Sequence, residues 1–149
     1  MDYWLMKSEP DAYSIDDLKK ERVDHWDGIR NYQARNFMQE MKKGDLILFY
    51  HSSCPEPGVV GVASVARKAY PDHTQFDPDG KHYDPKSDPD DPRWWMVDVR
   101  YKRKLKRTIG LKELKEQRRL EGMRLLQRGN RLSIMPVNKN EFDFILSLE

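Results

Sequence analysis

The segment from Trp26 to Phe37 carries a dense set of aromatic, amide and guanidinium side chains. Flat rings can stack on a planar heterocycle, and amides offer hydrogen-bond donors and acceptors to its edge. A pocket for such a ring needs this mixture of side chains. The side chains that could supply it are those of Trp26, Arg30, Asn31, Tyr32, Gln33, Arg35 and Asn36.

A turn and a helix must position these side chains. Asp27-Gly28 is a turn signal. The apolar residues that follow have helical spacing, with Phe37 and Met41 one turn apart, so one face should enter a core. A second interpretation is a capped surface helix, with Asn31 as the N-cap and the polar residues solvated. Residue types alone leave both interpretations open.

Trp26 is the first choice for a stacking platform. It lies at the turn beside polar neighbours, where burial alone would be an unusual use of an indole. Stacking of a base on an aromatic ring contributes about 1–3 kcal/mol. Trp4 and Trp95 lie in strand patterns and are expected in the core.

No catalytic, cofactor or metal site is predicted. Cys54 has no fixed base beside it, and His51-Ser52 lacks a third partner, so His51 is expected to bind a ligand or backbone. Phosphate and dinucleotide loops are absent. Asp77, Asp79 and Asp88 partly match a calcium loop, but Lys81 occupies a ligand position. The remaining candidates, His73 and His82, lack zinc-finger spacing.

The run from Arg100 to Arg107 is strongly basic. Local cations of this kind contact the phosphates of nucleic acids, and Lys102, Lys104 and Lys106 are the candidates. The alternatives are an exposed strand end or a localisation signal.

Composition is consistent with one domain spanning residues 1–149. The chain is 38% hydrophobic and 35% charged, with a net charge of +2, so binding to nucleic acid would depend on a local patch. No apolar run approaches the length of a membrane span, and a single cysteine gives no disulfide framework. We expect an intracellular monomer, cytoplasmic, or nuclear if the source is eukaryotic.

The order of elements predicts an α+β fold. Helices should begin at Ser14 and Asn138, each with an acidic residue three positions later that completes a capping box. Gly61 marks a bulge or a close approach, and the proline- and aspartate-rich segment 71–92 reads as a solvated loop. Strands are expected at 3–6, 46–50, 59–65, 94–101 and 132–137.

Several blocks of the sequence resemble, in order, those of the EVE domain in the PUA-like superfamily. The resemblance covers nearly the whole chain, and blocks of this length are far more specific than a short motif. One small departure is Ile29, where valine is expected. The blocks are Tyr3–Pro10, Trp26–Phe37, Phe49–Ser52 and Arg131–Ser133, with support from 69–74 and 96–99.

The resemblance implies a PUA-like mixed β-barrel of five to six strands flanked by short helices. It also implies a non-enzymatic reader of a flipped-out modified base, of the methylated cytosine or adenine class, in DNA or RNA. By match to these blocks, the pocket would comprise Lys7, Ser8, Trp26, Arg30, Asn31, Tyr32, His51, Ser52 and Arg131.

Roles within this set follow from side-chain chemistry. Trp26 and Tyr32 would stack on the base, and Asn31, Ser8 and His51 would read its polar edge. Lys7, Arg30 and Arg131 would hold phosphate. Two other hypotheses stay open: an enzyme acting on nucleotides or RNA, with Asp27 or Glu9 as its carboxylate, and a partner-binding scaffold.

Overall fold

The computed structural model describes all residues from 1 to 149. Its strands are β1 (Tyr3–Ser8), β2 (Val23–His25), β3 (Leu46–His51), β4 (Gly58–Pro71), β5 (Trp95–Gly110) and β6 (Ile134–Val137). Its α-helices are α1 (Ile15–Glu21), α2 (Tyr32–Glu40), α3 (Leu111–Lys115) and α4 (Lys139–Ser147). Short 3-10 turns span His73–Phe76, Arg118–Leu120 and Arg124–Leu126. No helix combines the length and the apolar character that crossing a membrane requires.

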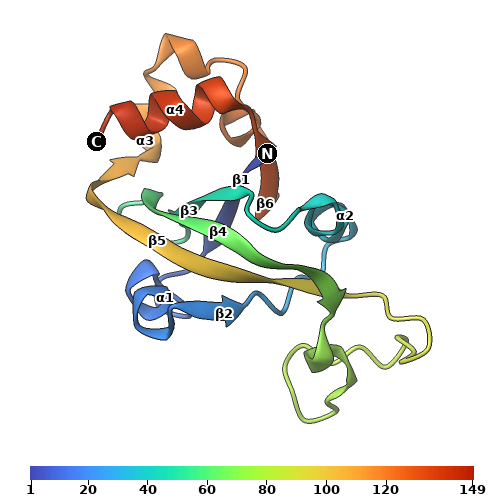
Figure 1. Cartoon of the computed structure of the whole chain (residues 1–149). Coiled ribbons are helices and arrows are strands. Elements are labelled where there is room, and N and C mark those ends of the chain that lie inside the picture. The colour runs from blue at the N-terminus through green and yellow to red at the C-terminus, as the bar shows by residue number, and fades with distance from the viewer.

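The six strands form one mixed sheet in the order β2-β5-β4-β3-β1-β6 (Figure 1). β1 and β3 are parallel, and every other pair is antiparallel. The α+β class and the flanking helices are thus confirmed. The sheet is not closed into a barrel, because the short edge strands β2 and β6 pair only with β5 and β1, respectively. The sequence analysis also missed β2, whose three residues are too few to show a periodic pattern.

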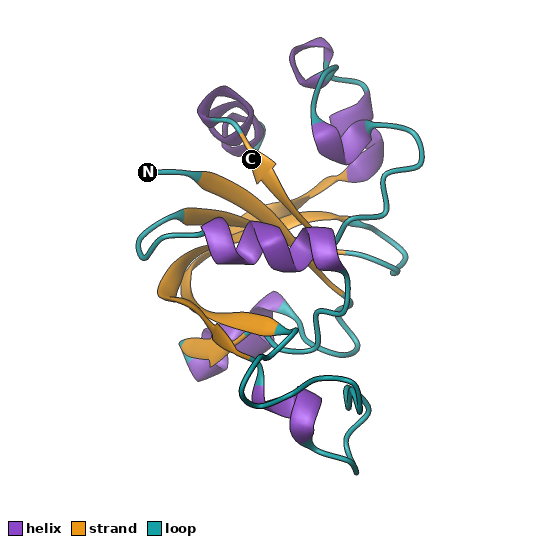
Figure 2. Ribbon diagram, turned by 90° about the vertical axis from the view of Figure 1, so that its right-hand side faces the viewer, coloured by secondary structure: helices purple, strands orange, loops and turns teal.

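Helices cover both faces of the sheet (Figure 2), and each face has its own apolar core. Successive residues of β1 alternate between them: Trp4 and Met6 pack with α1 and α2, and Leu5 packs with α3 and α4. Fully burying one large apolar side chain contributes about 1.5–3 kcal/mol. Both faces of the sheet are therefore strongly stabilised by apolar packing. Polar side chains that could bind a ligand lie at the ends of the strands, outside these cores.

The predicted helix starts are confirmed. Ser14 and Asn138 each form a complete capping box, with Asp17 and Glu141, respectively. Gly61 is confirmed as a point of close approach, since a Cβ there would lie 2.6 Å from the side chain of Ile15. Its missing side chain lets the start of α1 pack directly on β4.

The segment between β4 and β5 is anchored by buried hydrogen bonds, although its composition predicted a solvated loop. Gln75 is fully buried, and its amide nitrogen donates to the backbone carbonyls of Asp72 and Trp94, at 2.6 and 2.8 Å. Its amide oxygen accepts from Ser87 Oγ and from the amide of Trp94. The interpretation as a solvated excursion is therefore wrong at both ends of the loop, because one buried amide joins them.

Candidate functional site

A hollow of about 470 Å³ opens at the carboxyl end of β1, and we call it the Trp26 pocket. Three of the predicted site residues line it, namely Lys7, Ser8 and Trp26. The remainder of its wall comes from Ala12, Tyr13, Asp24, His25, Asp27, Ile29, Lys81 and His82. Four separate parts of the chain thus meet there: the end of β1, the approach to α1, β2 with the residues that follow it, and the loop between β4 and β5.

β2 and the residues that follow it fix the position of Trp26. β2 pairs with β5, and the amide of Trp26 extends this pairing by donating to the carbonyl of Val97 at 2.8 Å. Gly28 then adopts a φ of +80°, which only glycine adopts readily. The turn predicted at Asp27-Gly28 is nevertheless wrong, because residues 26–31 form neither a turn nor a bend. Trp26 lies in the wall of the pocket, at the start of this segment.

Trp26 is a buried wall of the pocket and not an open stacking surface. Only 8% of the residue is exposed, and its ring packs edge-to-face against Phe49 and Tyr13, at centroid distances of 5.5 and 6.4 Å. Its indole nitrogen has no acceptor in the protein, whereas no fully buried polar side-chain atom lacks a partner. That N–H must therefore reach solvent, and the pocket is where Trp26 borders it.

Lys7 contributes a cation without an anionic partner. Its ammonium group forms no ion pair and lies 5.7 Å from the centroid of the Tyr50 ring. Burial lowers the pKa of Lys7, because desolvation disfavours the charged form. An acceptor or an anion in the pocket would restore the solvation that the ammonium group has lost.

The carboxylates of the pocket already interact with neighbouring side chains of the protein. Tyr13 donates its phenolic O–H to Asp24 at 2.7 Å, and burial together with this carboxylate raises the pKa of Tyr13. His25 lies between Asp24 and Asp27, at 3.3 and 3.8 Å. Ser8 Oγ donates to the carbonyl of Tyr13 at 2.6 Å and keeps acceptor capacity.

Arg30 is engaged by the protein itself, and the phosphate-holding role predicted for it stays a prediction. Its guanidinium has five N–H donors, and all five are used within the protein. They bond the carbonyl of His82 twice, the carbonyl of Ile29, the carboxylate of Asp72 and the hydroxyl of Thr74, over 2.7–3.1 Å. A phosphate would have to displace one of these bonds.

Asn31 and Tyr32 lie outside the pocket wall. The side chain of Asn31 accepts from the amide of Ala34 at 2.9 Å and caps α2, as the second interpretation predicted. Tyr32 is 51% exposed and stacks on Trp94 at 4.8 Å, with the guanidinium of Arg35 on its ring. The base-reading and stacking roles predicted for this pair are therefore not supported by their positions.

His51 and Ser52 also serve the framework. His51 Nε2 accepts from the amide of Ile15 at 3.1 Å, so Nδ1 carries the proton, and burial lowers the pKa of His51. This side chain borders a different hollow, of about 370 Å³, together with Lys104 and Lys106. The amide of Ser52 donates to the carbonyl of Ser8 at 3.0 Å and extends the β1–β3 pairing.

Arg131 is exposed and makes no ion pair within the protein. It precedes Ser133, whose carbonyl accepts from the amide of Lys7 at 2.8 Å, so the chain brings Arg131 toward the end of β1. Its phosphate role stays a prediction.

The basic run lies on β5, and half of its cations are paired with carboxylates. Lys104 pairs with Asp16 at 3.0 Å, and Arg103 and Arg107 pair with Glu149 and Glu113. Lys102 and Lys106 have no carboxylate partner for their side chains, so phosphate contact by these two stays a prediction.

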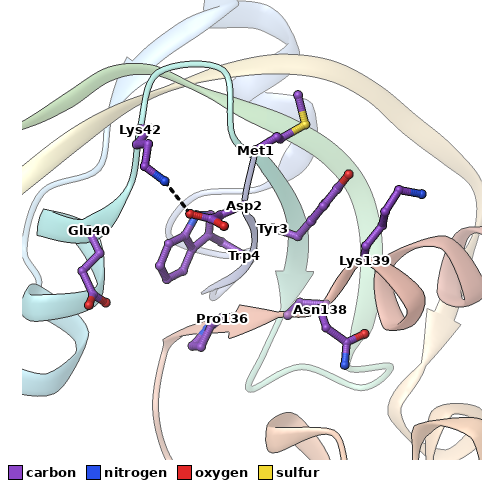
Figure 3. A pocket seen from close by; sticks show the side chains of 10 residues that line it. Met1, Asp2, Tyr3, Trp4, Glu40, Lys42, Pro136, Asn138 and Lys139 are labelled. Atoms are coloured by element: carbon purple, nitrogen blue, oxygen red, sulfur yellow. Dashed lines mark hydrogen bonds and ion pairs between the residues drawn. The ribbon is translucent and has the colours of Figure 1, made fainter.

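A second hollow, of about 500 Å³, lies at the start of β1 (Figure 3). Its polar side chains are mostly engaged with one another or with neighbours. Lys42 pairs with Asp2 at 2.7 Å, Lys139 pairs with Asp143, and the indole N–H of Trp4 donates to Asp45 at 3.0 Å. The Trp26 pocket differs in that the indole N–H of Trp26 and the ammonium group of Lys7 are both unpartnered.

Sequence reasoning missed the contribution of the loop before β5. Lys81 and His82 reach the Trp26 pocket from more than 50 positions beyond Trp26. The composition of their segment predicted only a solvated loop, although loops of this length inside a compact domain are often functional. The residues around β2 were missed because that strand was missed.

Comparisons with known proteins agree on one family. The EVE domain family matches residues 2–148. Thymocyte nuclear protein 1 of Mus musculus is 49% identical over 166 residues, which cover 99% of this chain and 73% of that protein. A crystal structure from Pseudomonas syringae matches with 48% identity and a TM-score of 0.95, over 98% of each chain. The crystal structure of human THYN1 protein in complex with DNA containing 5-methylcytosine matches with 47% identity and a TM-score of 0.94, over 99% of this chain and 97% of that one.

Proposed function

The chain belongs to the EVE domain family, and from this premise we propose that it reads a modified base in DNA. The base is turned out of its stack into the Trp26 pocket and bound there without turnover. The methylated cytosine class is the favoured ligand, because human THYN1 has been crystallised with DNA containing 5-methylcytosine. Methylated adenine and RNA are the alternative ligands.

The observation that carries this proposal is the set of unpartnered polar groups around an aromatic hollow. The indole N–H of Trp26 and the ammonium of Lys7 face a pocket of about 470 Å³ without partners in the protein. Pockets of this size enclose one small ligand and not a duplex. A base must therefore leave its helix to enter, as it does in proteins that contact base atoms hidden by stacking.

Hydrogen bonds already made by a carboxylate of the pocket support binding without catalysis. Asp24 already accepts from Tyr13 and from the amide of His25. Of the two carboxylates suggested for an enzyme, Asp27 lines the pocket and the side chain of Glu9 does not. Asp27 is therefore the residue on which an enzymatic alternative would depend.

The test compares duplexes with and without a single 5-methylcytosine. We expect tighter binding of the modified duplex, by about tenfold or somewhat more, since one methyl group in an apolar pocket is worth about 1–3 kcal/mol. Fluorescence anisotropy at fixed salt measures the ratio, because phosphate contacts make absolute affinities depend on salt.

Mass spectrometry of the oligonucleotide after long incubation, with and without divalent metal, should show no change. Equal affinity for the two duplexes would contradict the proposal that the protein recognises a modified base. A mass change that is lost in Asp27→Asn would place the protein among enzymes.

A further inference from the structure

One network of hydrogen bonds and an ion pair attaches the loop between β4 and β5 to the segment from Trp26 to Arg30. Asp72 is fully buried, and its carboxylate accepts from the amide of Gly28 at 2.8 Å and from Arg30 at 3.1 Å. It also accepts from the amide and the hydroxyl of Thr74, at 2.8 and 2.5 Å. A single buried carboxylate thus joins the start of the loop to Gly28 and Arg30, beside the pocket.

Arg30 completes the attachment further along the loop. Its Nε and Nη2 donate to the same carbonyl oxygen, that of His82, at 3.1 and 2.7 Å. The backbone of His82 is therefore held by two N–H donors from one planar guanidinium, whose geometry is rigid. This contact fixes the place at which the loop reaches the pocket.

Gly28 provides the space into which the His82 ring fits. A Cβ on Gly28 would lie 2.7 Å from Nε2 and 2.8 Å from Cε1 of His82, closer than side chains tolerate. The imidazole therefore lies directly against the backbone of Gly28, in the wall of the pocket. It makes no hydrogen bond through either ring nitrogen within the protein, and no fully buried polar side-chain atom is left without a partner, so both nitrogens reach solvent.

We propose that this loop forms the selective wall of the pocket, with His82 hydrogen-bonding the polar edge of the bound base and Arg30 positioning it. The inference rests on the proposed function and goes beyond it by naming the reading group. A neutral imidazole offers one donor and one acceptor, which suits the mixed edge of a cytosine. His82 thereby takes the role that the sequence had suggested for Asn31 and His51, which cap helices instead.

His82→Phe tests the reading group, because it keeps a flat ring and removes both nitrogens. We expect the variant to lose affinity for the 5-methylcytosine duplex by about tenfold or more, since the base edge would be buried without its partner. Tyr83→Phe is the matched control: it alters the neighbouring exposed residue of the same loop, and its affinity should equal that of the wild type.

Arg30→Gln tests positioning by a double-variant cycle. Its loss of affinity should be large in the wild-type background and nearly absent in the His82→Phe background, because its effect passes through His82. In the free protein, hydrogen exchange over residues 72–84 should become faster in Arg30→Gln. A merely structural Arg30 would lower affinity equally in both backgrounds.

Two failures can be told apart. Suppose that the wild type prefers the modified duplex and that His82→Phe retains this affinity in full. The inference that His82 reads the base is then wrong, and the proposed function stands. If the wild type binds both duplexes equally, the proposed function fails and this inference fails with it.

Discussion

Replacing Trp26 with alanine should lower the free energy of unfolding by about 3–5 kcal/mol, the range for removing a large aromatic side chain from a core. Trp26 is 8% exposed and belongs to the core that also contains Phe49 and Met38. The sequence predicted a stacking platform at this position, for which the same substitution would weaken binding and leave the fold intact; the burial of Trp26 predicts a loss of stability instead. Denaturant unfolding monitored by circular dichroism measures the change.

Tyr32→Ala is the control for this result. Tyr32 lies in the same segment but is 51% exposed, and its stacking on Trp94 should be worth no more than about 1.5 kcal/mol. If Trp26→Ala unfolds at the wild-type midpoint while losing DNA binding, Trp26 is an open platform, and the buried position described above is wrong.

Replacing Asp72 with alanine should destabilise the protein by about 3–5 kcal/mol, the cost of removing one partner from a buried ion pair. Arg30 would lose its counter-ion, and the amides of Gly28 and Thr74 would lose their acceptor. Asp79→Ala, on the same loop but exposed and without a side-chain partner, should change stability by no more than about 0.5 kcal/mol. Equal stabilities of the two variants would contradict the inference that Asp72 anchors the loop to Gly28 and Arg30.

The effect of Asp72 should also depend on pH. Burial raises the pKa of Asp72, but hydrogen bonds from Thr74, Gly28 and Arg30 outweigh it and hold that pKa below its usual range. A depressed native pKa contributes stability that is complete above the unfolded-state value of about 3.9 and is lost as pH falls through the native value. The stability gap between wild type and Asp72→Ala should therefore narrow in acid.

Features that depend on neighbours in sequence were predicted well. The capping boxes at Ser14 and Asn138 each depend on a residue three positions later. Local hydrogen bonds decide these features, so residue types alone reveal them.

The composition of the pocket could be predicted only in part. Lys7, Ser8 and Trp26 line it, but Arg30 turns its guanidinium to a carbonyl 52 positions further along the chain, and His51 turns to the start of α1. Which donors remain free depends on segments brought together by the sheet, and one sequence carries no local signal of that pairing. For the same reason, His82 was noted only as a poor zinc ligand.

The most direct test of the central claim follows the four indole N–H groups by NMR during titration with a 5-methylcytosine oligonucleotide. Trp4, Trp94 and Trp95 already donate to Asp45, Asp84 and the carbonyl of Pro92, so they serve as internal references. Trp26 alone has a free indole N–H, and its resonance is assigned by its absence in Trp26→Phe. A large shift of the Trp26 signal, with the other three nearly unmoved, is the predicted result. A Trp26 signal that stays in place at saturation would contradict the entry of the base into this pocket.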